Sequence, residues 1–114
     1  MTNTVRLTMA QALVAHLAAL RIEHDDGSLE PYCAGVWAIF GHGNVAGLGE
    51  ALAQVRDTLP THRAHNEQAM AHAAIAFAKA NMRQRIMAVT TSIGPGATNL
   101  LTAAALAHVN RLPV

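Results

Sequence analysis

The chain has 114 residues, of which 52% are hydrophobic and only 13% are charged, and its net charge is +1. Such a composition argues against intrinsic disorder and against duplex nucleic acid as a partner. The single cysteine, Cys33, cannot form an internal disulfide. Neither a signal peptide nor an apolar run of about 18 residues is visible, so we expect a cytoplasmic protein without a membrane span.

The same composition predicts one small domain that is not self-sufficient. Alanine is abundant and aromatic residues make up 4%, so the outer faces of the helices carry few charged side chains. Apolar helix faces that the domain does not bury itself would suit burial against another domain or subunit. Leu112, Pro113 and Val114 have the composition of a strand that begins there. We therefore expect residues 1–114 to form one incomplete domain, truncated at its C-terminal side.

In the first third of the chain, a helix is predicted to begin after Thr8, because residues 8–11 fit a capping box. Apolar residues at helical spacing predict its buried face: Met9, Ala12, Leu13, Leu17 and Leu20. A turn follows at residues 25–28, and Pro31 disfavours helix. Residues 36–40 are continuously apolar, which is typical of a strand covered on both faces in a parallel sheet.

Helices and strands then alternate. We expect a tight loop at residues 41–44, a helix at 48–55, a short strand at 61–64 and a helix that Asn66 caps. The inner face of that helix is predicted to comprise Met70, Ala73, Ala74 and Phe77. A strand at 86–91, a loop at 94–96 and a helix at 98–109 complete the pattern. This alternation predicts an α/β fold, a three-layer sandwich with a parallel sheet.

Ligands of open α/β sheets bind beyond the carboxyl ends of the strands, where both glycine loops are expected. Residues 41–46 match a loose dinucleotide fingerprint, but a helix precedes the strand and no acidic residue ends a following strand at the expected offset. The loop could instead be a turn that requires glycine, or a substrate-facing loop with His42 and Asn44 as polar contacts. The loop at 94–96 could be a rigid turn, a phosphate nest or a backbone surface for a flat ligand.

Glu67 is the strongest catalytic candidate. It falls in the first turn of a helix that is almost devoid of charge. An acidic residue there is favoured by the helix dipole alone, which is the structural explanation. The functional explanation is that a partly buried carboxyl, which must be paired or protonated, serves in proton transfer.

Other reactive side chains carry weaker signals. Cys33 has no activating neighbour and is expected to be a small buried residue. His62, His65 and His72 lack the spacing of a zinc site, so no metal ligand set is predicted. His72 could be a buried histidine with a hydrogen-bond partner.

Two segments together carry a family resemblance. Residues 66–74 (Asn-Glu-Gln-Ala-Met-Ala-His-Ala-Ala) and 91–100 (Thr-Ser-Ile-Gly-Pro-Gly-Ala-Thr-Asn-Leu) resemble the N-terminal pyrimidine-binding domain of thiamine-diphosphate enzymes. The resemblance implies that Glu67 hydrogen-bonds N1′ of the cofactor's aminopyrimidine, favouring the imino tautomer that deprotonates C2. It also implies cofactor-binding residues at Gly94, Pro95, Gly96 and Asn99.

The resemblance further implies what lies outside these residues. In this superfamily the diphosphate and Mg²⁺ are held by a Gly-Asp-Gly…Asn motif of a C-terminal domain, and no such motif occurs here. The active site would form between subunits of a homo-oligomer. We therefore expect the isolated chain to be inactive and to bind the cofactor weakly or not at all.

Within that superfamily, residues 5–13, the insert at 24–33 and the loop at 39–49 resemble a group that opens a cyclic 1,2-diketone with water in inositol catabolism. This implies a small-molecule diketone substrate facing His42, Gly43 and Asn44. Asn66 stands where many superfamily members have His, and this departure agrees with the ring-opening group. Ala69 stands where Gly is common. Alternatives are an acetolactate synthase-like enzyme acting on a 2-keto acid, and a non-catalytic assembly module.

Overall fold

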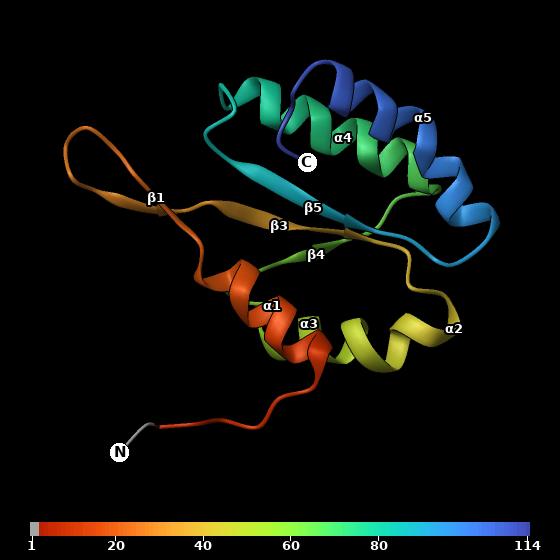
Figure 1. Cartoon of the computed structure of the whole chain (residues 1–114), viewed down its shortest axis with the longest axis horizontal. Helices are drawn as coiled ribbons and strands as arrows, with labels where there is room; N and C mark the ends of the chain where they lie inside the picture. The colour runs from red at the N-terminus through yellow and green to blue at the C-terminus, as the bar shows by residue number, and fades with distance from the viewer. Residues whose placement is uncertain (1–2) are drawn as a thin grey trace.

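The computed structural model describes residues 3–114 and has three layers, with helices on both faces of a parallel sheet (Figure 1). The sheet has the strand order β4-β3-β5, with β3 at Cys33–Ala38, β4 at Thr61–His62 and β5 at Ile86–Thr90. One face carries α1 (Met9–Ala19) and α3 (Glu50–Gln54), and the other carries α4 (Glu67–Ala80) and α5 (Pro95–Val109). The predicted three-layer α/β sandwich with a parallel sheet is confirmed.

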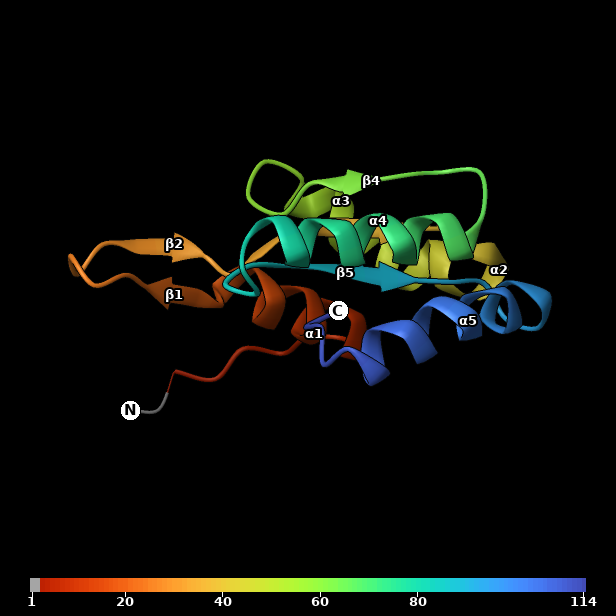
Figure 2. The same cartoon turned by 90° about the horizontal axis from the view of Figure 1, so that it is seen from above.

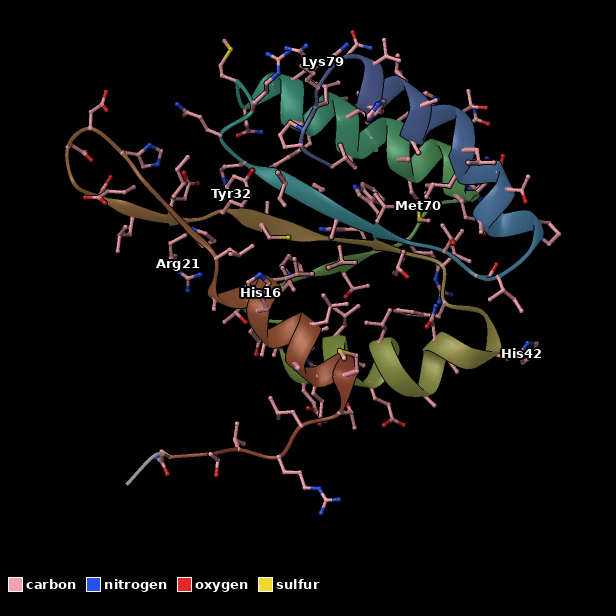
Figure 3. All side chains as sticks on the ribbon, viewed as in Figure 1. His16, Arg21, Tyr32, His42, Met70 and Lys79 are labelled. Atoms are coloured by element: carbon pink, nitrogen blue, oxygen red, sulfur yellow. The ribbon has the colours of Figure 1, made fainter. Side chains whose placement is uncertain are left out.

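The sheet is buried on both faces because each layer of helices contributes its own apolar cluster. Val14 of α1 and Leu52 of α3 pack with Val36 of β3 on one side. On the other side, Ile75 of α4 and Ala103 of α5 belong to a second cluster. Met70, which is fully buried, lies between α4 and the sheet (Figure 3). Small alanines at these contacts let the two helices approach the strands closely.

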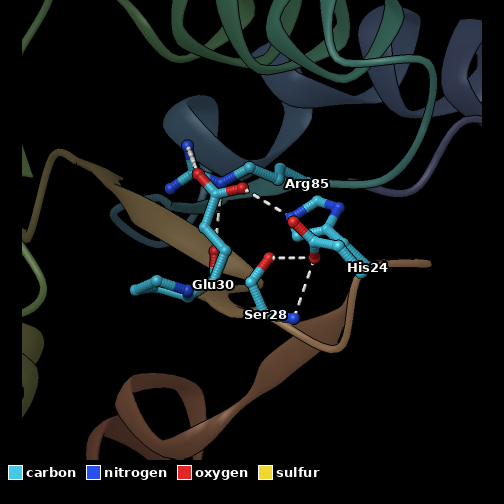
Figure 4. Close-up of polar contacts among 6 residues, drawn as sticks. His24, Ser28, Glu30 and Arg85 are labelled. Carbon is cyan, nitrogen blue, oxygen red and sulfur yellow. Dashed lines mark hydrogen bonds and ion pairs between the residues drawn. The ribbon is translucent and has the colours of Figure 1, made fainter.

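A β-hairpin projects from the sandwich beside the sheet (Figure 2). Its antiparallel strands are β1 (Arg21–Glu23) and β2 (Leu29–Pro31). The sequence predicts the turn between them but not the strands, since three residues are too few for an alternating pattern to show. The Glu30 carboxylate pairs with Arg85 at 2.7 Å and with His24 at 3.1 Å, which ties the hairpin to the segment before β5 (Figure 4).

The capping box at the start of α1 is confirmed, with reciprocal bonds between Thr8 and Gln11. The predicted buried face of this helix is partly wrong, because Met9 is 84% exposed and Leu13 is 46% exposed. Val14 is the buried residue of α1 instead. Apolar residues surround this helix on all sides, so periodicity alone does not select the face that meets the sheet.

The segment after β3 differs from the prediction of a tight loop followed by a helix at 48–55. The chain turns helical at once, through α2 (Gly41–Asn44), a π-helical turn η1 (Val45–Gly49) and then α3. Glycine disfavours helix by about 1 kcal/mol per residue, which is why residues 41–49 do not predict one. Packing of Leu48 and Leu52 against the core outweighs that preference.

The strand boundaries also differ from the prediction. β3 begins and ends earlier than the predicted 36–40, because Cys33 already pairs with Ile86 of β5. The predicted strand at 61–64 is formed only at Thr61–His62, and the one at 86–91 is confirmed to within one residue. Residues 112–114 carry no strand, although Leu112 is buried.

The two helices that cover the second face begin as follows. Asn66 caps α4 as predicted, its side chain accepting a bond from Ala69 N at 2.8 Å. On the predicted inner face, Met70 and Ala74 are buried, whereas Ala73 and Phe77 are less completely covered. Helix α5 begins at Pro95 rather than at 98, because proline suits the first helical turn once Gly94, at φ +65°, has redirected the chain.

Candidate functional site

Three connections meet at the carboxyl edge of the sheet, as a parallel topology requires. Gly41 follows β3 with φ +63°, and a Cβ built there would lie 2.8 Å from the Cβ of Ser92, which follows β5. The Asn44 side-chain amide donates to the Thr91 carbonyl at 3.2 Å. The two glycine loops predicted from the sequence therefore pack directly against each other.

The proposed substrate-facing residues border a cavity of about 450 Å³. His42, Gly43 and Asn44 contribute one wall, and the remaining lining residues are Phe40, Gly41, Ser92 and Ile93. The His42 side chain is exposed and extends outward from the end of the molecule (Figure 3). Ile93, which also lines the cavity, is 90% exposed.

Glu67 is the one buried charged residue among residues 3–114, with an exposure of 9%. It occupies the first position of α4, immediately after the capping residue Asn66. The cap fixes the direction in which the helix starts, and the positive end of the helix dipole favours a carboxylate there. The sequence prediction of an acidic first turn that is partly buried is thus met.

Gly96 forms the wall opposite Glu67. A Cβ built on Gly96 would lie 2.5 Å from Glu67 Oε1 and 2.4 Å from Ser92 Oγ, closer than any side chain tolerates. The glycine therefore allows α5 to bring its backbone against the carboxylate. Glu67 consequently lies at the N-terminal ends of both α4 and α5, where the partial charges of both helices favour the carboxylate.

Asn99 completes the surroundings of the carboxylate from the second turn of α5. Its side-chain amide Nδ2 donates to Glu67 Oε2 at 3.4 Å, across 32 positions of sequence. Asn99 itself is half-buried. Gly94 and Pro95, by contrast, are exposed at the start of α5, and neither residue hydrogen-bonds Glu67 within residues 3–114.

The structure thus brings the predicted residues together in two adjoining groups. His42, Gly43 and Asn44 border the cavity, while Glu67, Gly96 and Asn99 lie next to it and Glu67 is not in its lining. Ser92 connects the two groups, since it lines the cavity and also faces Gly96. The sequence reasoning missed Ser92 as a site residue. Its position after β5, at the carboxyl edge of the sheet where ligands bind, could have indicated it.

The weaker candidates lie elsewhere. Cys33 is buried, 2% exposed, as expected for a small core residue. The His62 ring lies beside that of Trp37, with centroids 5.2 Å apart and the planes tilted by 45°. Half-buried His72 contacts the Gln68 amide at 3.4 Å. Within residues 3–114, no group of three or more His, Cys, Asp or Glu side chains is placed to share a metal ion.

None of the helices in residues 3–114 has both the length and the apolarity needed to cross a membrane.

Chemically, the site offers a buried carboxylate, a neutral amide that donates to it, and the buried backbone of Gly96 packed against it. A carboxylate in such a place can hold or exchange a proton with a ring nitrogen that approaches it. The absence of a side chain on Gly96 leaves room for that carboxylate itself, which packs against the glycine backbone. The neighbouring cavity, bordered by polar His42 and Asn44, can receive a separate small molecule.

Comparison with known proteins gives two consistent results. A family model described as "Thiamine pyrophosphate enzyme, N-terminal TPP binding domain" matches residues 33–114. Three relatives carry the name 3D-(3,5/4)-trihydroxycyclohexane-1,2-dione hydrolase. The chain is 54% identical over 114 residues to the one from Shouchella clausii, 53% over 112 to that of Listeria monocytogenes and 50% over 114 to that of Bacillus subtilis. These alignments cover 98–100% of this chain but only 17–18% of the relatives.

Proposed function

Because the chain belongs to the family of N-terminal TPP-binding domains of thiamine pyrophosphate enzymes, we propose that it forms the pyrimidine-binding part of a thiamine-diphosphate-dependent hydrolase. In this proposal Glu67 is the catalytic carboxylate. The observation that carries it is the burial of Glu67 at the start of α4, with its carboxylate against the bare backbone of Gly96. A buried charge of this kind is costly and is characteristic of functional sites.

The residues present fit the pyrimidine ring of the cofactor. An aminopyrimidine has a basic ring nitrogen, which suits a buried carboxylate at the N-terminal ends of two helices, and Gly96 is the residue that lets this carboxylate fit there. Glu67 would hold or donate the proton at N1′, and Gly94, Pro95, Gly96 and Asn99 would line the ring. When bound, thiamine diphosphate supplies a nucleophilic carbon and an electron sink for breaking a bond between two carbonyl carbons.

The remaining parts of the active site are proposed to come from outside these residues. Mg²⁺ and the diphosphate would be held by a C-terminal domain of another subunit in a homo-oligomer. The extent of the relatives agrees with this, since the chain spans less than a fifth of their length. The exposed apolar residues of α5, Leu101 and Val109, are surfaces that such an assembly would cover.

The proposed substrate is a cyclic 1,2-diketone, trihydroxycyclohexane-1,2-dione, which water would open to 5-deoxy-glucuronate in inositol catabolism. The names of the relatives that are 50–54% identical support this choice. His42, Gly43 and Asn44 would face the substrate from the cavity beside Glu67. His42 carries a ring that can hydrogen-bond the hydroxyl groups of such a polyol.

The experiment compares Glu67→Gln with Glu50→Gln in the protein that carries this chain, using the cyclic diketone and, separately, pyruvate as substrates. Glu50 is exposed on α3 and is the matched control. We expect Glu67→Gln to lower kcat on the diketone by about 10²–10⁴-fold, and Glu50→Gln to leave it unchanged. Turnover of pyruvate instead of the diketone would identify a 2-keto-acid enzyme. Full activity of Glu67→Gln on the diketone would contradict the catalytic role of Glu67 and would favour a non-catalytic assembly module.

A further inference from the structure

The Asn99 side chain makes a contact that lining a cofactor pocket does not require. Its amide Nδ2 lies 3.4 Å from Glu67 Oε2, and this is the one side-chain hydrogen bond that Glu67 makes within residues 3–114. The two residues come from different helices, α5 and α4, which meet on one face of the sheet. The contact therefore depends on tertiary packing and does not arise from neighbouring positions in sequence.

The two oxygens of the Glu67 carboxylate are constrained from different sides. Oε2 accepts a hydrogen bond from the Asn99 amide. Oε1 lies 2.5 Å from the point that a Cβ on Gly96 would occupy. A carboxylate held at one oxygen cannot rotate freely about its terminal bond. The other oxygen is then kept against the Gly96 backbone, so the carboxylate has a fixed orientation toward the ring that is proposed to bind.

We propose that Asn99 is a positioning residue, which orients the catalytic carboxylate of Glu67 through this hydrogen bond; the inference rests on the role proposed above for Glu67. A group that transfers a proton works only when it is held in line with the nitrogen that it serves. Asn99 supplies that orientation without adding a charge. A neutral donor satisfies the buried carboxylate and leaves it available as an acceptor.

An aspartate substitution separates positioning from simple structure. The side chain introduced by Asn99→Asp has nearly the same size, but when ionised it only accepts hydrogen bonds and places a negative charge next to Glu67. Positioning predicts that Asn99→Asp is worse than Asn99→Ala, because the like charges repel. A merely structural role predicts instead that both substitutions lower the stability of the fold and leave kcat of the folded protein unchanged.

The first test is spectroscopic and needs no cofactor. The carboxyl carbon of Glu67 is followed by NMR in the full chain and in Asn99→Ala and Asn99→Asp. Asn110→Ala and Asn110→Asp serve as controls, since Asn110 donates to the Leu106 carbonyl at 2.9 Å at the other end of α5. We expect the Glu67 signal to shift in both Asn99 variants and to stay in place in both controls. An unchanged Glu67 signal in folded Asn99→Ala would overturn the proposal.

The second test uses turnover by the protein that carries this chain. We expect Asn99→Ala to lower kcat at least about tenfold with little change in KM, and Asn99→Asp to lower it further. In the background of Glu67→Gln, the Asn99 substitution should cause no additional loss, because the two residues act as a unit. An equal further loss in that background would contradict positioning. If Glu67→Gln itself kept full activity, the proposed function would fail while the NMR result still decided whether Asn99 orients Glu67.

Discussion

Gly96 makes the sharpest prediction at the scale of a single residue. Gly96→Ala would place a methyl group 2.5 Å from Glu67 Oε1 and 2.4 Å from Ser92 Oγ, so one of these groups must move. We expect a loss of about 1–3 kcal/mol in the free energy of unfolding, measured with urea, as for other overpacked sites. Cofactor-dependent activity should fall in the same variant, because the new methyl group would displace the Glu67 carboxylate from its position.

Gly47→Ala is the matched control for this substitution. A Cβ there would meet only the Ala10 Cβ, at an ordinary contact distance of 3.8 Å. The residue lies in a helical turn, so the alanine should stabilise the chain by roughly 0.5–1 kcal/mol. If the two variants changed stability equally and in the same direction, the close approach of Gly96 to Glu67 would be refuted.

Some residues of the site can be predicted from the sequence, and others cannot. The acidic first turn of α4 and the glycine loop before α5 are visible in the sequence, and the structure places Glu67 and Gly96 in contact. The bond from Asn99 to Glu67 could not be predicted from pattern alone, because it joins two helices 32 positions apart. The position of Ser92 after β5 places it at the carboxyl edge of the sheet, but its close approach to Gly41 and Gly96 comes from tertiary packing.

At the scale of an element, the β1–β2 hairpin carries the clearest pH-dependent contact. The Asp26 carboxylate accepts bonds from the Ser28 hydroxyl at 2.6 Å and from the Ser28 backbone N–H at 2.9 Å. These bonds, the hydroxyl first, lower the pKa of Asp26 below its ordinary value of 3.8. A lowered pKa in the folded state means that the carboxylate contributes stability above pH 3.8, which is lost as the pH falls through the folded pKa.

Ser28→Ala tests this contact without removing the charge of Asp26. We expect the difference in urea midpoint between the wild type and Ser28→Ala to be present at about pH 5 and to shrink toward about pH 2. The effect should be small, because the Asp26 side chain is in water. A difference that stayed constant over this range would show that the hydroxyl does not favour the ionised form of Asp26.

Element boundaries show where local pattern and tertiary packing disagree. The capping signals of Thr8 and Asn66 and the strand at Ile86–Thr90 are predictable because the information is local. The helical run from Gly41 to Gln54 is not, since its glycines favour a loop and only the core contact of Leu48 and Leu52 makes it helical. The buried face of α1 is ambiguous in the sequence because apolar residues lie all around that helix.

At the scale of the whole molecule, the site is proposed to be one half of a cofactor pocket. The carboxylate, the glycine wall and the cavity are formed by residues 3–114, whereas a cluster of ligands for a metal was not found in that range. We therefore expect the isolated 114-residue chain to give no clear calorimetric signal with millimolar thiamine diphosphate and Mg²⁺. A clear binding signal from this chain alone would contradict the division of the pocket between domains.

The effect of Glu67 on the bound cofactor is the central claim for the molecule as a whole. The measurement that tests it is the rate at which the C2 proton of thiamine diphosphate exchanges with deuterium in the protein that carries this chain. The rate requires no substrate, so it is independent of the choice between a cyclic diketone and a 2-keto acid. We predict that Glu67→Gln slows the exchange by about 10²-fold or more, while Glu50→Gln leaves it unchanged. Equal exchange rates in cofactor-loaded wild type and Glu67→Gln would show that Glu67 is not the catalytic carboxylate.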